Sequence, residues 1–74
     1  MTLRSGGGPA RLLLRCWRLG MREDVSQRVE PGPDRSALLR HEFLVKSVWS
    51  QSYQNYYCLT AAGREAAQVL QASS

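Results

Sequence analysis

Residues 56–67 read Tyr-Tyr-Cys-Leu-Thr-Ala-Ala-Gly-Arg-Glu-Ala-Ala, and this stretch decides the fold. The part up to Leu59 is aromatic and apolar, which is typical of a strand. Thr60 follows, and threonine is a favoured residue at the amino-terminal cap of a helix. From Ala61 onward, helical spacing places small and apolar residues on one face, which is expected to pack, opposite a polar face of Arg64, Glu65, Gln68 and Gln71. The packed face is formed by Ala62, Gly63, Ala66, Val69 and Leu70. The stretch therefore predicts a strand that ends at Thr60 and a helix that begins directly after it.

The residues upstream predict a partner strand and a helix. Residues 43–50 are rich in β-branched and aromatic side chains, whereas residues 51–55 are polar and turn-like. Strands over 43–50 and 56–59 would form a hairpin, with Trp49 and Tyr57 expected to pack in its core. Before it, the run Glu30-Pro31-Gly32-Pro33 forces a turn, and Asp34 is placed to cap a helix over residues 35–42. This helix is expected to bring Leu38, Leu39 and Phe43 together. Residues 23–29 are long enough for two more helical turns.

The first third of the chain carries a regular arginine row. Residues 1–9 predict a flexible lead-in and residues 10–21 a helix, on which four arginines fall within an arc of roughly 60°: Arg11, Arg15, Arg18 and Arg22. One interpretation is the solvated face of a structural helix, with Leu13, Trp17 and Leu19 toward the core. The other is a mitochondrial targeting helix over residues 10–22, because such helices are arginine-rich and free of acids. A third interpretation is that the row binds nucleic acid or an acidic surface. Initiation of translation at Met21 would remove the row.

The charge is divided unevenly along the chain. Residues 1–22 carry five arginines and no acid, a formal charge of +5, while residues 23–74 carry five basic and six acidic residues, a formal charge of −1. The pI of about 9.7 therefore belongs to the first third. Two cysteines are too few for a disulfide framework, and the longest early apolar run, Leu12-Leu13-Leu14, is too short for a signal sequence or a membrane span. We expect an intracellular protein with reduced thiols and no transmembrane segment.

The order of elements from Asp34 to Gln71 is helix, strand, polar loop, strand, helix, and it resembles the second half of a winged-helix domain. Within that superfamily it is most similar to the winged helix of crossover-junction, structure-specific endonucleases. The matching residues are Ser36-Ala37-Leu38-Leu39, Leu44-Val45, Tyr57-Cys58-Leu59-Thr60-Ala61-Ala62-Gly63 and Ala67-Gln68-Val69-Leu70. The predicted fold is a small α+β winged-helix-like domain over residues 10–72, with helices and a two-stranded antiparallel hairpin.

The resemblance implies a recognition helix, a wing hairpin and a terminal helix, with the first two contacting DNA. Carried onto this chain, the candidate contacts are Arg35, Arg40 and His41 on the helix and Lys46, Gln51, Tyr53, Gln54 and Asn55 at or beside the wing. The chain departs from the family because its wing has no basic tip and the whole half is near neutral. The expected partner is therefore either double-stranded or branched DNA or a protein, and the expected location is nuclear.

The sequence does not assemble a catalytic site. His41 is the one histidine, without cysteines or carboxylates at ligand spacing, and Cys58 lies in an apolar strand where it is expected to pack. The glycines at 6–8 follow no strand and lack the lysine of a phosphate-binding loop. We expect a non-catalytic binding module without cofactor, metal or small-molecule substrate. The alternative is a small mitochondrially targeted protein that serves as a subunit or accessory factor of a larger assembly.

Overall fold

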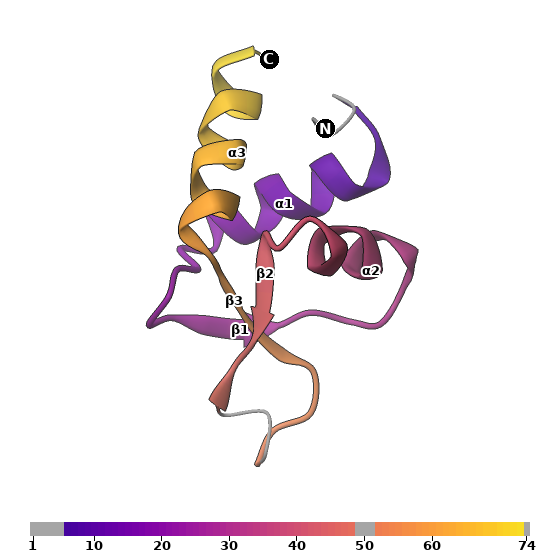
Figure 1. The fold of residues 1–74 in the computed structure, drawn as a ribbon, viewed down its shortest axis with the longest axis vertical. Helices are drawn as coiled ribbons and strands as arrows, with labels where there is room; N and C mark the ends of the chain where they lie inside the picture. Colours follow the sequence, from indigo (N-terminus) through magenta and orange to yellow (C-terminus); the bar gives the residue numbers. More distant parts are fainter. Residues whose placement is uncertain (1–5, 49–51, 74) are drawn as a thin grey trace.

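A computed structural model describes residues 6–48 and 52–73 as a small α+β domain. The elements are α1 (Gly8–Arg18), β1 (Ser26–Arg28), α2 (Pro33–Arg40), β2 (Leu44–Lys46), β3 (Tyr56–Leu59) and α3 (Ala61–Ser73). The three strands form one antiparallel sheet in the order β1-β3-β2. The α+β class is confirmed, and the predicted hairpin is extended by a third strand. In Figure 1 the helices gather at one end, and the end of β2 and the start of β3 lie away from them.

β3 is the central strand, and it pairs with both β1 and β2. Its residue Cys58 lies opposite Val45 of β2 and opposite Ser26 of β1. The predicted strand over residues 43–50 begins one residue later in the structure, because the Phe43 amide closes the end of α2 by donating to the Leu38 carbonyl oxygen at 2.9 Å. It ends at Lys46, and residues 49 and 50 of the prediction lie outside the described residues. The predicted strand over residues 56–59 has its expected bounds.

The helical turns expected over residues 23–29 are wrong, since β1 lies there. Arg22 and Val25 exchange two backbone hydrogen bonds of 3.2 and 3.0 Å around a tight turn, and the ladder with β3 begins at the next residue. A helix of two turns is marginal in isolation, because nucleation fixes many dihedrals for few hydrogen bonds. Pairing with β3 satisfies the same backbone groups and buries Val29.

Helix α1 ends earlier than its apolar pattern predicts. Gly20 adopts a φ of 80°, its amide donates to the Trp17 carbonyl, and the Met21 amide donates to the Cys16 carbonyl. This is a Schellman motif, in which a residue with positive φ ends the helix. As a result Leu19, expected in the core, is 52% exposed, while Met21 is buried instead.

Helix α2 begins one residue before Asp34, so the expected cap at Asp34 is wrong. Gly32 occupies the cap position without a side-chain hydrogen bond, and Pro33 is the first helical residue. Proline suits this position because its φ is already helical and its missing N–H would have no partner there. Asp34 lies in the first turn of α2, and its carboxylate lies against Gly8 in the first turn of α1. Its negative charge is therefore near the amino-terminal ends of two helices, where it is favoured.

The core lies where the three helices meet the sheet. It is formed by Leu13, Cys16, Met21, Val29, Leu38, Leu44, Tyr57, Leu59 and Ala67, with Leu12, Trp17, Leu39, Phe43, Ala66 and Leu70 packed around it. The expected grouping of Leu38, Leu39 and Phe43 is confirmed, as is core packing for Tyr57. Trp49, also expected in the core, lies outside the described residues. On α3, Ala62 and Val69 were expected on the packed face but are exposed.

The junction of β3 and α3 is fixed by the Leu-Thr-x-x-Gly sequence of residues 59–63. The Thr60 hydroxyl accepts a 3.0 Å hydrogen bond from the Gly63 amide, which confirms the expected cap, and donates a 2.7 Å hydrogen bond to the Glu42 carbonyl. The Thr60 amide donates to the Phe43 carbonyl at 3.0 Å. Thr60 therefore joins the start of α3 to the corner between α2 and β2.

Candidate functional site

Two residues expected to contact DNA, Arg35 and Asn55, are held together inside the domain. One terminal nitrogen of Arg35 donates to the Val29 carbonyl and to Asn55 Oδ1, both at 3.0 Å. The guanidinium carbon lies 4.8 Å from the centre of the Tyr57 ring, in cation–π geometry. Asn55 has a φ of 65°, which asparagine tolerates better than most residues, and its carbonyl accepts from the Val29 amide at 2.8 Å. Arg35 therefore fastens α2 to the end of β1 and to the base of the hairpin.

The other two candidates on α2 lie at its carboxyl-terminal end. Arg40 is exposed in the last turn. His41 follows as the capping residue, is half-buried, and stacks on Phe43 with ring centres 5.3 Å apart and planes 14° apart. Arg40 thus presents a free charge to solvent, whereas the His41 ring covers part of the Phe43 ring.

The candidates near the hairpin loop are exposed and carry little charge. Lys46 lies at the end of β2, and Tyr53 and Gln54 precede β3. The Tyr53 ring, 55% exposed, lies 5.5 Å from that of Tyr56. Gln51 lies outside the described residues. Within residues 6–48 and 52–73, the hairpin offers Lys46 as its one cation, so the neutral character expected from the sequence holds for the described part of the wing.

A surface that sequence reasoning did not anticipate lies on the face of the sheet opposite the core. Ser26, Cys58 and Val45 lie side by side across the three strands, and strand alternation places their side chains on one face. They line a shallow hollow of about 180 Å³ with Val48. We call Ser26, Val45, Val48 and Cys58 the outer sheet surface. The outer sheet surface was not predicted from sequence because β1, one of its strands, was not predicted. The one available signal was Val45, an apolar residue next to the core residue Leu44, since neighbouring residues of a strand point to opposite faces.

The outer sheet surface combines exposed apolar side chains with paired charges. Val45 is 49% exposed and Val48 is 82% exposed. Two carboxylates at its rim are already in ion pairs, Asp24 with Arg22 at 3.2 Å and Glu23 with Arg64 at 3.5 Å. The arrangement leaves Lys46 as the unpaired charge among the described residues that line the hollow.

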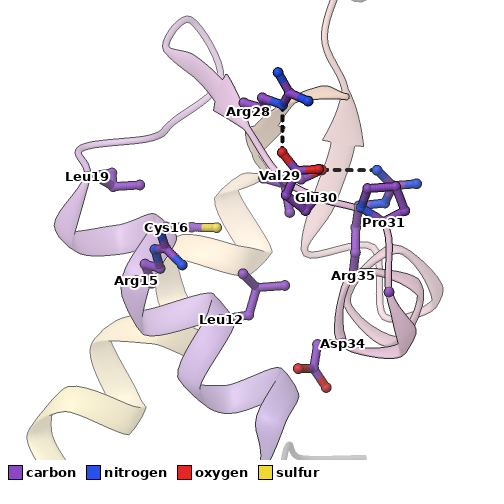
Figure 2. A pocket seen from close by; sticks show the side chains of 11 residues that line it. Leu12, Arg15, Cys16, Leu19, Arg28, Val29, Glu30, Pro31, Asp34 and Arg35 are labelled. Atoms are coloured by element: carbon purple, nitrogen blue, oxygen red, sulfur yellow. Dashed lines mark hydrogen bonds and ion pairs between the residues drawn. The ribbon is translucent and has the colours of Figure 1, made fainter. Parts of the chain in front are cut away.

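A second hollow, of about 210 Å³, lies between α1 and the segment that joins β1 to α2 (Figure 2). Arg28 and Glu30 form an ion pair of 2.6 Å at its edge. Cys16 contributes its thiol to the wall, and burial raises the pKa of this thiol to about 11, with the neighbouring Arg15 opposing the shift. The thiol is therefore protonated at neutral pH, which makes it a poor nucleophile.

Three of the four arginines of the predicted row lie on the exposed side of α1, whereas Arg22 follows the helix and pairs with Asp24. Arg11, Arg15 and Arg18 are exposed, while Leu13 and Cys16 on the other side are buried in the core. This placement supports the structural interpretation of the helix. The mitochondrial interpretation stays a prediction, but removal of residues 10–22 from the folded domain would open its core.

Comparison with protein-family models, with curated proteins and with solved structures finds no match for the chain. Across residues 6–48 and 52–73, no helix has the length and apolar character needed to cross a membrane. The same residues contain no group of three or more side chains that are suited to hold a metal ion. The function is therefore inferred from the shape, exposure and charge of the surfaces described above.

Proposed function

We propose that the chain is a small winged-helix-like module that acts by binding rather than by catalysis, and that its outer sheet surface binds a partner protein. The observation that carries the proposal is the row of Ser26, Cys58 and Val45 across three strands, continued by Val48, in which Val45 and Val48 are exposed to solvent while Cys58 is buried. The order α2, β2, β3, α3 is the one that the winged-helix resemblance implies, and it supports the architecture.

Burial of this surface would supply affinity. Complete burial of a valine side chain contributes about 1.5 kcal/mol or more, and both Val45 and Val48 have exposed area left to bury. A shallow apolar centre with a polar rim is also how protein interfaces are built. Tyr56 shares the outer face with Cys58 by alternation, so the Tyr53 and Tyr56 rings, which contact each other at a tilt of 43°, adjoin the same surface.

The charges disfavour DNA as the partner of the hairpin face. Phosphate binding needs several cations that are free to replace the counterions of the duplex. On α2 and the described part of the hairpin, Arg35 is engaged internally, which leaves Arg40 and Lys46. Two cations beside exposed valines suit a protein surface better than a phosphate backbone.

Site-specific photo-crosslinking in cells tests the proposal. A photoreactive residue placed at Val48 is expected to give one discrete protein adduct, and the Val45→Asp change should abolish it. Val69→Asp is the matched control, because Val69 is 62% exposed on α3, away from the sheet. The adduct protein, purified, should then shift the amide resonances of Ser26, Val45 and Cys58.

Two results would contradict this assignment. One is an adduct that Val45→Asp and Val69→Asp affect equally. The other is a shift of the Arg40, Lys46 and Gln54 amides on titration with duplex or branched DNA at physiological ionic strength, which would assign the hairpin face to nucleic acid.

A further inference from the structure

The exposed side of α1 carries a straight row of positive charge that the proposed function leaves unused. Arg11, Arg15 and Arg18 follow one another at intervals of four and three residues, so they lie on one side of the helix. At a rise of about 1.5 Å per residue, the row is about 10 Å long. We call these three residues the α1 arginine row.

The charge of this row is not neutralised within the described part of the chain. The ion pairs there use Arg22, Arg28 and Arg64, and none includes a member of the row. Asp34 lines a hollow with Arg11 and Arg15, and it lies at the amino-terminal end of α1 beside Gly8. Glu30 lines another hollow with Arg15, but it is already paired with Arg28 at 2.6 Å. The row therefore keeps a net positive charge, most of all toward Arg18.

We propose that the α1 arginine row binds the phosphate backbone of a double-stranded nucleic acid. Phosphates follow one another by about 3.4 Å along the axis of each strand of a duplex, so a row of about 10 Å spans about three of them. Arginine suits this contact because its planar guanidinium donates to phosphate in a bidentate manner. Binding of this kind reads no bases, so it does not depend on sequence.

The packing of α1 argues against a membrane as the polyanion. An amphipathic helix that lies on a membrane inserts its apolar face among the acyl chains. The centre of the apolar face of α1 is already buried, with Leu13 and Cys16 at 0% and 1% exposure, so the folded protein cannot insert this face and has only Leu19, which is 52% exposed after the helix, as a large exposed apolar side chain beside the row. This inference does not depend on the proposed function, because the row and the outer sheet surface use different elements.

The test is fluorescence anisotropy with a labelled duplex of random sequence, titrated at several salt concentrations. Neutralisation of about three phosphates predicts a slope of log K against log salt near −2.7, which is an affinity loss of about 40-fold between 50 and 200 mM salt. The triple variant Arg11→Gln, Arg15→Gln, Arg18→Gln should bring that slope close to zero. The matched control Arg28→Gln, Arg40→Gln, Lys46→Gln removes the same charge elsewhere and should keep a slope near −2.7.

Mapping of the wild-type protein by NMR keeps the proposal testable if the triple variant does not fold. Titration with the duplex should shift the amides of residues 11–19 and leave those of residues 44–46 unchanged. Equal loss in the two triple variants would overturn the proposal, as would shifts confined to residues 35–55. Binding to polyglutamate or to anionic vesicles with the affinity found for the duplex would also overturn it and assign the row to a general acidic surface.

Discussion

At the scale of single residues, Thr60 does the most to connect distant parts of the chain. Its hydroxyl accepts from the Gly63 amide at the start of α3 and donates to the Glu42 carbonyl at the end of α2. Because both partners are backbone groups, neither bond depends on the identity of another side chain. The two bonds explain why a hydroxyl side chain, which both accepts and donates, suits this junction better than a capping carboxylate that only accepts.

Substitution of Thr60 by valine removes both hydrogen bonds and keeps the shape of the side chain. Each such bond contributes about 0.5–1.5 kcal/mol, so Thr60→Val should lower the free energy of unfolding by about 1–3 kcal/mol. Thr60→Ser keeps the hydroxyl and should lose less than half of that amount. Urea denaturation followed by circular dichroism measures both variants, and an equal loss in the two would contradict the role of the hydroxyl.

Glu42 adopts an unfavourable backbone conformation at the end of α2. Its φ is 61°, its amide donates to the Leu39 carbonyl, and the next amide, that of Phe43, donates to the Leu38 carbonyl. This is the Schellman geometry seen at Gly20, but with a non-glycine residue in the left-handed position.

Replacement of Glu42 by glycine should therefore stabilise the domain, since glycine adopts positive φ without a steric penalty. We expect Glu42→Gly to raise the free energy of unfolding by about 0.5–1 kcal/mol. Glu42→Ala removes the same charge without relieving the backbone and should leave the stability within about 0.5 kcal/mol of wild type. Thermal denaturation of both proteins compares them, and a gain of equal size in the alanine variant would point to charge instead of conformation.

At the scale of elements, the position of α3 depends on the absence of a side chain at Gly63. A Cβ atom there would meet the carbonyl oxygen of Phe43 and would lie 3.1 Å from both its carbonyl carbon and Leu59 Cδ1. The helix therefore rests directly on the backbone at the start of β2. This contact gives the glycine of the Leu-Thr-x-x-Gly sequence a packing role.

Whether Gly63→Ala raises or lowers the free energy of unfolding tests this packing. In an exposed helix, alanine is favoured over glycine by about 1 kcal/mol, so a loosely packed α3 would be stabilised. Against the Phe43 backbone, the added methyl group should instead destabilise the domain by about 1–3 kcal/mol. The exposed Gln68→Ala change on the same helix serves as a control and should alter the unfolding midpoint in urea little.

The elements that could be predicted from sequence are those with local signals. The hairpin, the Thr60 cap and α3 follow from β-branched residues, a polar loop and helical spacing, all within residues 43–73. Strand β1 could not be predicted, because Ser26, Gln27 and Arg28 have no strand pattern and become a strand by pairing with β3. The outer sheet surface depends on that strand and was missed with it. The internal role of Arg35 likewise depends on partners 6 and 20 residues away.

At the scale of the whole molecule, α1 completes the core that the sheet and the other helices leave open. Leu13 and Cys16 of α1 are buried with Met21, which follows the helix. A domain of this size has a small free energy of unfolding, because proteins are stable by only about 0.05–0.15 kcal/mol per residue. The first third of the chain, which looks separable by charge, is therefore part of the same folding unit.

The Cys16 thiol gives this unit a pH dependence. Burial raises its pKa from 9.0 to about 11, so between these values the unfolded chain loses the proton while the folded chain keeps it. The unfolded state then binds fewer protons, and the free energy of unfolding should fall as pH rises, by at most about 1.4 kcal/mol per pH unit. Urea denaturation at pH 8, 9 and 10 should show this decline in wild type and in Cys58→Ala but a smaller one in Cys16→Ala. Equal slopes in all three would show that Cys16 is not buried as a thiol.

The central claim is that β3 lies between β1 and β2, because the core face and the outer sheet surface both depend on that order. NMR spectroscopy of the full chain tests it most directly through nuclear Overhauser contacts between backbone protons of neighbouring strands. The structure predicts contacts from residues 57 and 58 to residues 26 and 27 on one side and to residues 45 and 46 on the other. Helical chemical shifts over residues 23–29, with no contact from them to β3, would contradict the account.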